Sequence, residues 1–414
     1  MRGRASFRAK GKKMPIKGTS NSAQTKQNNI RELLNAVREH GPISKRELQS
    51  ITGLSWGAVS GLMTIIERNG YVVRLGKRGE GVGRKAYEYD INPNENLIIG
   101  GEIRLGEVIV TVTDLKGRAL REYDRGYTSL DVDEVMASLN RLIETAIGDF
   151  AGRNICGIGL SLQGAVDVER GISKHISSRD PRWRNVPVKA MLEERFGLPV
   201  VLQHDPDSVY LAEKYHGDSG LRDCPDSALI RLSYSGTGMA IVLDGDNHLY
   251  SNGHFCDIAH VCVDYNGPVC PSCGKRGCLA NYTVLYNVLP RYTEYCRERG
   301  LLGEKEAVTP ESFIARGRMG EAAALDFWHQ TGRAIGSALS TLCNLIKLDR
   351  VVVYGEMVEA KDLFADQVFE SFSSHTRDTR SAEICYSLLD RRAASIGAAI
   401  NYSMEYIGGL TFAD

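Results

Sequence analysis

The chain has 414 residues, 43% of them hydrophobic and 25% charged, which is the composition of a soluble globular protein with two or three domains. Its apolar runs are only long enough for strands and no export signal is expected at its N-terminus, so we expect a cytoplasmic protein without a membrane-spanning helix. The formal net charge of zero conceals an asymmetry, because residues 1–90 hold 18 basic and 7 acidic side chains, an excess of 18 − 7 = 11, and the remainder carries the opposite excess.

A basic segment on an acidic body is typical of a nucleic-acid-binding domain. The first 27 residues are basic and rich in Gly, Ser and Asn, and they show no helical spacing of apolar residues. This composition predicts a disordered basic tail over residues 1–27. Such a tail could be a solvated charge run, so the indication of nucleic-acid binding rests on the segment that follows it.

Residues 28–92 carry the pattern of a winged helix-turn-helix. Apolar residues at helical spacing predict a first helix over Asn28–Glu39. Ser44 and Glu47 form a capping box for a second helix, and Ser55 is the expected N-cap of a third. A helix-turn-helix inserts the start of its second helix into the major groove of DNA, so this segment is the expected DNA-binding domain.

A basic, glycine-rich hairpin follows the third helix. Strands are expected over Tyr71–Leu75 and Lys85–Ile91, and the segment between them suits a wing that lies beside phosphates. The residues expected to contact DNA are Ser44, Lys45, Arg46, Ser55, Trp56, Ser60, Lys77, Arg78, Arg84 and Lys85. The helices alone could form a protein–protein module, but the basic wing favours DNA.

The rest of the chain, residues 97–414, alternates strand and helix patterns and predicts an α/β domain. The expected strands are residues 97–102, 108–114, 119–123, 155–161, 198–203, 227–233, 238–244 and 351–354. The expected helices are residues 135–150, 188–196, 321–346 and 391–406.

One imidazole and three thiols cluster within residues 260–278 at the spacing H-x9-C-x2-C-x4-C. The four ligand candidates are His260, Cys270, Cys273 and Cys278. Four such ligands suit a tetrahedral, structural Zn2+. The alternatives are reduced cysteines without metal and, less favoured without an oxidising compartment, disulfides. Cys256 and Cys262 flank His260 and are rival ligands.

Several motifs quoted from this chain resemble those of one family. The stretches G-P-I-S-K-R-E-L, T-G-L-S-W-G-A-V-S and G-V-G-R-K-A-Y-E-Y resemble the DNA-binding head of ROK-family repressors of the NagC and xylose-repressor type, and the cysteine cluster resembles that family's zinc motif. The resemblance runs from about Asn28 to the C-terminus. It implies a two-lobed, ribonuclease H-like (actin-like ATPase, sugar-kinase-like) effector domain with the sugar between the lobes. The family more often has C-x-C than Cys270-x-x-Cys273, and a polar residue rather than Trp56.

Departures from the family's pattern bear on kinase chemistry. Arg104 and Leu105 stand where the family has the two glycines of its first phosphate loop, and Gln163 stands where it prefers proline. Tyr354 replaces a glycine of the nucleotide-side pair. The turn from Ser235 to Gly238 is kept, although it could be a plain tight turn. Because phosphoryl transfer needs phosphates held by glycine-rich backbone, we expect no kinase activity.

The sugar side of the family's site is partly kept. Asp205 matches the catalytic aspartate and is here a vestigial base candidate, and Ala280 replaces a glutamate that holds sugar hydroxyls. The effector-binding residues implied by the resemblance are Gly164, His204, Asp205, Gly238, Asp257 and His260. The alternative for His204 and Asp205 is a polar strand end without a ligand.

These features together predict a DNA-binding transcriptional regulator, a repressor of carbohydrate metabolism that is controlled by a sugar or sugar-like effector and has no kinase activity. The expected partners are a double-stranded DNA operator and a second copy of the chain, as a homodimer or homotetramer. The alternative is an active ATP-dependent ROK sugar kinase with an appended DNA-binding head.

Overall fold

The computed structural model describes residues 22–78, 86–245, 256–377 and 382–412. The chain forms two compact units. The first combines residues 1–90 with Ile407–Asp414, and the second comprises Ile91–Tyr406. The C-terminal residues therefore belong to the same unit as the N-terminal helices.

The first unit is three helices beside a small sheet of order β1-β3-β2. Its elements are α1 (Ser22–His40), β1 (Ile43–Ser44), α2 (Lys45–Thr52), α3 (Trp56–Arg68), β2 (Val72–Arg78) and β3 (Ala86–Ile91). Leu33, Leu48 and Met63, one from each helix, are fully buried. The predicted caps are present: Ser44 forms a capping box with Glu47, and the Ser55 side chain accepts a hydrogen bond from the backbone of α3.

The first helix begins at Ser22, so the prediction of disorder is wrong for residues 22–27. The physical reason is a partner from the other end of the chain. The side-chain amide of Gln27 donates to the Phe412 carbonyl at 2.7 Å, and the Phe412 backbone donates back to it at 2.8 Å. Arg31 donates to the Leu410 carbonyl at 2.8 Å, and the Phe412 ring meets the Tyr71 ring edge-on. These contacts stabilise the start of α1, including residues 22–27.

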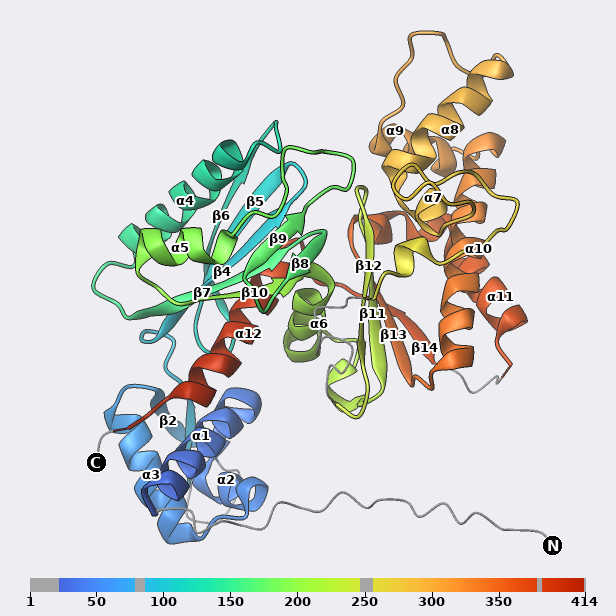
Figure 1. The fold of residues 1–414 in the computed structure, drawn as a ribbon. Helices are drawn as coiled ribbons and strands as arrows, with labels where there is room; N and C mark the ends of the chain where they lie inside the picture. The colour runs from blue at the N-terminus through green and yellow to red at the C-terminus, as the bar shows by residue number, and fades with distance from the viewer. Residues whose placement is uncertain (1–21, 79–85, 246–255, 378–381, 413–414) are drawn as a thin grey trace, which may run out of the picture. The chain divides into compact units, whose positions relative to one another are not determined.

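The first lobe of the second unit is built on a five-stranded sheet of order β10-β7-β4-β5-β6. Its strands are β4 (Leu97–Arg104), β5 (Glu107–Thr113), β6 (Ala119–Gly126), β7 (Ile155–Leu162) and β10 (Val200–His204). Helices α4 (Val132–Asp149) and α5 (Val188–Phe196) cover one face (Figure 1). Helix α12 (Ala393–Gly409) packs on the other face, where a Cβ at Gly100 or Gly159 would collide with its backbone. Glycine at both positions permits this close approach.

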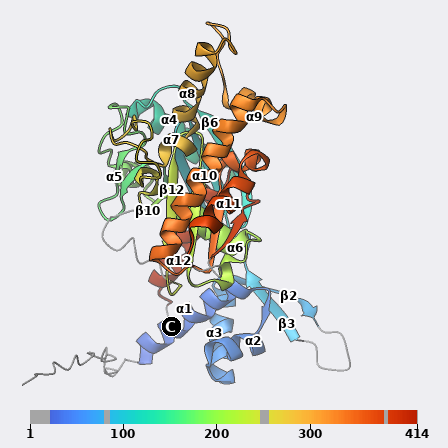
Figure 2. The ribbon, with the colours of Figure 1, turned by 90° about the vertical axis from the view of Figure 1, so that its right-hand side faces the viewer.

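The second lobe contains a four-stranded sheet of order β12-β11-β13-β14. Its strands are β11 (Ser227–Leu232), β12 (Thr237–Val242), β13 (Arg350–Tyr354) and β14 (Glu383–Tyr386). The helices of this lobe are α7 (Ala280–Thr283), α8 (Leu285–Glu298), α9 (Pro310–Arg318), α10 (Ala322–Leu345) and α11 (Ala365–His375). Figure 2 looks onto this lobe and shows α10 and α11 lying side by side. Gly332 and Gly336 of α10 meet the backbone of α11 and permit the short distance between the two helices.

The remaining elements of the second unit in the described ranges are β8 (Ala165–Asp167), β9 (Ile172–His175), α6 (Asp205–His216) and 3-10 helices at Leu221–Asp223, Ile258–His260 and Glu356–Leu363. Helix α6 directly follows β10 and packs on β11 and β12 of the other lobe. The sequence did not predict β1, β8, β9, α6 to α9, α11 or β14, whereas each predicted strand and helix is present within a few residues of its expected bounds. No helix in the described ranges is long and apolar enough to cross a membrane.

Candidate ligand cleft and metal site

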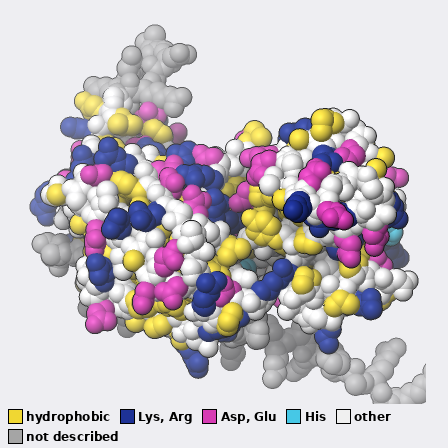
Figure 3. Space-filling view, turned by 90° about the horizontal axis from the view of Figure 1, so that it is seen from above, with side chains coloured by type: hydrophobic (Ala, Val, Ile, Leu, Met, Phe, Trp, Pro, Cys, Tyr) yellow, Lys and Arg dark blue, Asp and Glu magenta, His cyan; other side chains and the backbone are white. Residues whose placement is uncertain are grey.

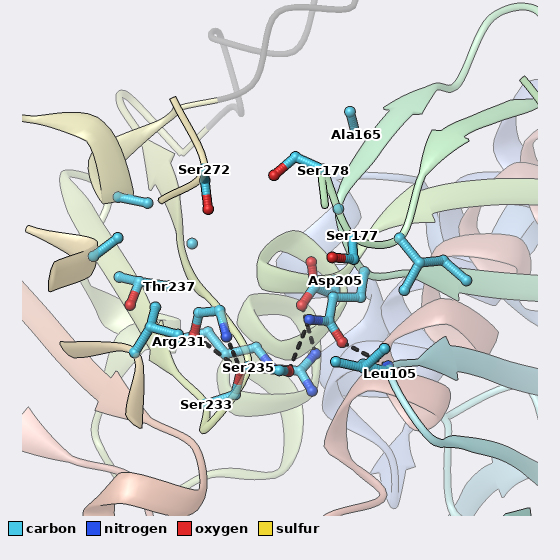
Figure 4. Close-up of a pocket in the computed structure, with 18 of the residues that line it drawn as sticks. Leu105, Ala165, Ser177, Ser178, Asp205, Arg231, Ser233, Ser235, Thr237 and Ser272 are labelled. Atoms are coloured by element: carbon cyan, nitrogen blue, oxygen red, sulfur yellow. Dashed lines mark hydrogen bonds and ion pairs between the residues drawn. The ribbon is translucent and has the colours of Figure 1, made fainter. Parts of the chain in front are cut away.

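A cavity of about 370 Å³ lies between the lobes of the second unit. Figure 3 shows the hollow between the two lobes, with side chains of both charges on either side of it. All six residues predicted to bind an effector line the cavity, namely Gly164, His204, Asp205, Gly238, Asp257 and His260. They come from distant parts of the chain, and the fold brings them to one place. Serine and threonine hydroxyls, among them those of Ser177, Ser178 and Thr237, add further hydrogen-bonding groups (Figure 4).

The junction of β10 and α6 places His204 and Asp205 on the cavity wall. His204 is the N-cap residue of α6 and Asp205 is its first residue. A carboxylate at a helix N-terminus faces unpaired backbone N–H groups and the positive end of the helix dipole, which stabilise it. Gly238 on β12 lies against Pro206, where a Cβ would come within 2.7 Å of the proline ring. Glycine at this position lets the second lobe approach the start of the helix.

Arg231 on β11 contacts two carboxylates of the first lobe. Its Nη1 lies 2.7 Å from Oδ2 of Asp205, and its Nη2 lies 2.8 Å from Oε1 of Glu102. All three side chains are at most 9% exposed. Burial by itself lowers the pKa of Arg231, but the two carboxylates outweigh it and raise that pKa, so the guanidinium stays charged. Burial raises the pKa of Glu102, although Arg231 opposes this shift.

Arg231 lines the cleft but is not among the site residues predicted from the sequence. Its strand reads S-A-L-I-R-L, in which Arg231 is the one charged residue and all six positions are buried. A buried arginine is almost always paired, so this single charge could have signalled a carboxylate partner in the cleft.

Asp205 has both carboxylate oxygens engaged. Oδ2 accepts from Arg231, and Oδ1 lies 3.3 Å from Nε2 of His204. Asp207 lies 3.6 Å from the other ring nitrogen of His204. A sugar hydroxyl that approached Asp205 would have to share an oxygen already held by a cation, which disfavours the role of free general base that the family's aspartate performs.

The side chains that replace the phosphate-loop glycines face a second cavity, of about 310 Å³. Arg104, at the end of β4, donates to Glu107 and, at 3.0 Å, to Glu356 of the second lobe. Gln163 accepts from the Leu105 backbone at 2.9 Å and donates to Ser235 at 3.0 Å. Side chains therefore line this side of the cleft, where the family's glycines would leave the backbone accessible.

The four predicted metal ligands lie together. The candidate ligand atoms of His260, Cys270, Cys273 and Cys278 are all within 4.8 Å of one another. Nδ1 of His260 faces Cys270 at 3.7 Å, and the sulfurs of Cys273 and Cys278 are 3.5 Å apart. The group found among the described residues includes neither of the predicted rivals. One imidazole and three thiols are a donor set that suits zinc.

The backbone around the cluster explains why a glycine directly precedes Cys278. Gly277 has a φ of 68° and lies against the Asp264 carbonyl, where a Cβ would be only 1.6 Å away. Cys278 pairs through its backbone with Cys262, which holds the loop closed. His260 belongs to the cluster and also lines the larger cavity, so the cluster and the cleft share one side chain.

The predicted DNA-contacting residues have different surroundings in the first unit. Trp56, at the start of α3, is 54% exposed, and Arg46 on α2 is also exposed. Lys45 is partly engaged, because its Nζ donates to the Ser60 carbonyl at 3.4 Å and lies over the Tyr89 ring. Trp56 and Arg46 are thus the side chains most available to a partner.

Two of the predicted contacts have a structural role. The side chains of Ser44 and Ser55 accept backbone hydrogen bonds at the starts of α2 and α3. Lys77 and Arg78 belong to β2, but their side chains lie outside the described part of the structure, as do the whole residues Arg84 and Lys85.

Comparisons with known proteins identify relatives of the chain. The sequence pattern described as ROK family matches residues 99–403. The chain is 27% identical over 361 residues to a putative xylose repressor of Caldicellulosiruptor sp. (strain Rt8B.4), a match that covers 84% of this chain and 88% of that protein. It is 26% identical over 400 residues to the DNA-binding transcriptional dual regulator NagC of Escherichia coli (strain K12), covering 93% of this chain and 94% of that protein.

Solved structures share the fold. A ROK family transcriptional regulator, a homologue of the E. coli MLC protein, superimposes with a TM-score of 0.76 at 22% identity and covers 93% of this chain and 97% of its own. A ROK family glucokinase from Streptomyces griseus, in complex with glucose and AMPPNP, superimposes with a TM-score of 0.63 at 22% identity and covers 73% of this chain and 98% of its own. The predicted sugar-kinase-like fold is confirmed by these matches.

Proposed function

Since the chain belongs to the ROK family, we propose that it is a DNA-binding transcriptional repressor of carbohydrate metabolism. The first unit binds an operator through α3 and the wing, and a sugar or sugar-like effector binds in the cavity between the lobes of the second unit. A relative named a putative xylose repressor and one named a DNA-binding transcriptional dual regulator match along more than 80% of this chain and support the proposal. The observation that carries it is the capped α2–α3 pair with Trp56 and Arg46 exposed, because this is the geometry of a helix-turn-helix.

The second part of the proposal is that the cleft binds its ligand without phosphorylating it. A kinase has to hold the nucleotide phosphates and keep a base free for the accepting hydroxyl. In this chain Arg104 and Leu105 line the phosphate side, and Arg231 holds Asp205. Asp205 and His204 then serve as hydrogen-bonding groups for a hydroxylated ligand rather than as catalytic residues.

The third part is that the His260 cluster holds a structural zinc ion. The closed set of four ligands leaves no position for a reacting water, so zinc there would supply folding free energy and fix a loop of the second lobe. With Nδ1 of His260 directed to the cluster, its Nε2 is the nitrogen left for the cavity. Residues of the cluster would then orient one ligand-binding side chain.

Assembly and location complete the proposal. A helix-turn-helix protein reads two half-sites about one helical turn of DNA apart, so a homodimer or homotetramer in the cytoplasm is the form that fits this function. An effector that binds one arrangement of the lobes better than another would shift the population of DNA-binding-competent molecules.

The test is a mobility-shift assay with the full chain and promoter DNA at several salt concentrations. We expect a Kd of about 10⁻⁸ M or tighter for one promoter, and weaker binding to random DNA. Trp56→Ala should lower this preference, whereas Arg299→Ala, an exposed change directly after α8 of the second unit, should not. Equal affinity for every DNA at every salt concentration would contradict the proposed function.

A further inference from the structure

The floor of the cleft carries two buried carboxylates that face one cation. Glu102 lies near the end of β4, and Asp205 begins α6. Their side chains are 0% and 9% exposed, and Arg231 reaches them from β11 of the opposite lobe. Figure 4 shows the Arg231 side chain and Asp205 at the centre of the cavity floor.

Two carboxylates directed at one point are a ligand set for a hard divalent cation. Here a guanidinium donates to one oxygen of each at 2.7 and 2.8 Å, so a covalently held positive charge fills the place between them. The second oxygen of Glu102 and Nε of Arg231 have no hydrogen-bond partner among the described residues. One guanidinium is therefore the charged partner that both carboxylates share.

Arg231 also lies between the two cavities. The residues that line both are Leu105, Gln163, Arg231, Ser233, Ser235 and Tyr286. The Gln163–Ser235 hydrogen bond, 3.0 Å long, connects the lobes in this wall, and the Arg231 ion pairs connect them at its base. A group transferred from the smaller cavity to the larger one would have to pass through these side chains.

We propose that Arg231 is a resident cation that replaces a divalent metal ion between Glu102 and Asp205. In that position it excludes a metal–nucleotide complex from the cleft. It also connects the two lobes in place of a metal ion. Arg231 is thus the specificity-determining residue, because it makes the cleft a binding site for a ligand that carries no metal ion. The proposal deepens the proposed function and rests on its assignment of the cleft to binding without phosphoryl transfer.

The experiment measures Mn2+ binding by electron paramagnetic resonance, using the full chain kept loaded with zinc, with and without ADP. We expect no Mn2+ site dependent on Asp205 in the unmodified protein or in Arg231→Lys, which keeps a cation at this place. Arg231→Gln should gain at least tenfold in Mn2+ affinity, and Arg231→Gln combined with Asp205→Asn should lose that gain. Arg299→Gln, a change of the same chemistry on the surface, should behave as the unmodified protein.

Two results would overturn the proposal: Mn2+ binding by the unmodified protein that Asp205→Asn abolishes, or a folded Arg231→Gln that gains no Mn2+ affinity. Removing one partner of a buried ion pair is strongly destabilising, so the unfolding temperature of Arg231→Gln is measured as well. We expect Mn2+ to raise it and to leave that of the double variant unchanged, and an equal response of the two variants would also count against the proposal. Operator binding, assayed in parallel, tests the proposed function separately. A protein that fails to bind an operator can still give the expected Mn2+ result.

Discussion

Gln27 and Phe412, 385 positions apart in the chain, hold each other through two hydrogen bonds between the Gln27 side-chain amide and the Phe412 backbone. This contact makes the C-terminal segment a part of the N-terminal unit. A fragment that ended after β3 would lack the partner of α1, so the DNA-binding unit is best studied in the full chain.

Gln27→Ala should therefore destabilise the first unit. Two hydrogen bonds are lost, each with a net contribution of about 0.5–1.5 kcal/mol, so we expect a loss of about 1–3 kcal/mol in the free energy of unfolding. Hydrogen–deuterium exchange of the α1 amides across a denaturant series measures it, since the buried Trp183 and Trp328 of the second unit would dominate fluorescence. Gln24→Ala is the matched control, because Gln24 is exposed and donates a hydrogen bond to Asn28 on the same helix. Equal effects of the two changes would contradict the role of Phe412.

Metal content tests the cysteine cluster. Cys273→Ser and Cys278→Ser should each release about one equivalent of zinc and lower the unfolding temperature, because structural zinc contributes folding free energy. Elemental analysis of the purified variants and thermal unfolding with and without chelator check this. Cys262→Ser, a change beside the cluster, and Cys385→Ser, far along the chain, should retain the metal. The assignment would fail if the unmodified protein held well under one zinc per chain and its unfolding temperature did not change with chelator.

The wing is tested by salt dependence. Arg84→Ala and Lys85→Ala should weaken binding to all DNA sequences alike, and each should flatten the slope of log affinity against log salt concentration by about one unit, because each removes one phosphate contact. Trp56→Ala or Ser60→Ala should instead change the preference among sequences. A wing variant that altered sequence preference and left the salt slope unchanged would reverse these assignments.

The cleft is tested by effector response. Asp205→Asn should weaken effector binding by about 10- to 100-fold, the loss expected for a hydrogen bond to a charged group, and should leave the DNA affinity of the ligand-free protein intact. Titration of DNA-bound protein with a sugar panel measures the first, and a mobility shift without sugar measures the second. No hexose-dependent ADP release is expected. Phosphorylated sugar that disappears in Asp205→Asn would establish the kinase alternative.

His204 predicts a dependence of stability on pH. Burial lowers its pKa, but the nearby carboxylates of Asp207 and Asp205 outweigh burial and the repulsion of Arg231, so the pKa lies above its ordinary value of 6.5. Because the folded pKa exceeds the unfolded one, the stabilisation is complete below pH 6.5 and is lost as the pH rises through the folded pKa. Urea unfolding across this range should show the decline, and His204→Asn should flatten it. A decline of the same size in His204→Asn would assign the effect to another group.

Local interactions could be predicted from the pattern of residue types. The Ser44–Glu47 capping box, the helix that begins after Ser55 and the four-ligand spacing that starts at His260 all depend on residues close together in the chain. Their geometry follows from one helical turn or one tight loop, so the pattern of residue types was sufficient. The strand and helix order of the second unit was readable for the same reason, because hydrophobic periodicity is a local signal.

Contacts between residues far apart in the chain could be identified only from the tertiary structure. Arg231 and Glu102 are 129 positions apart, and no spacing rule connects an arginine on β11 with a glutamate on β4. Gln27 meets Phe412 only because the chain returns to its beginning, and for that reason residues 22–27 became helix where composition alone predicted disorder. Burial and ion pairing act through space, so the residues that close the cleft and complete the N-terminal unit became identifiable only once the chain was folded.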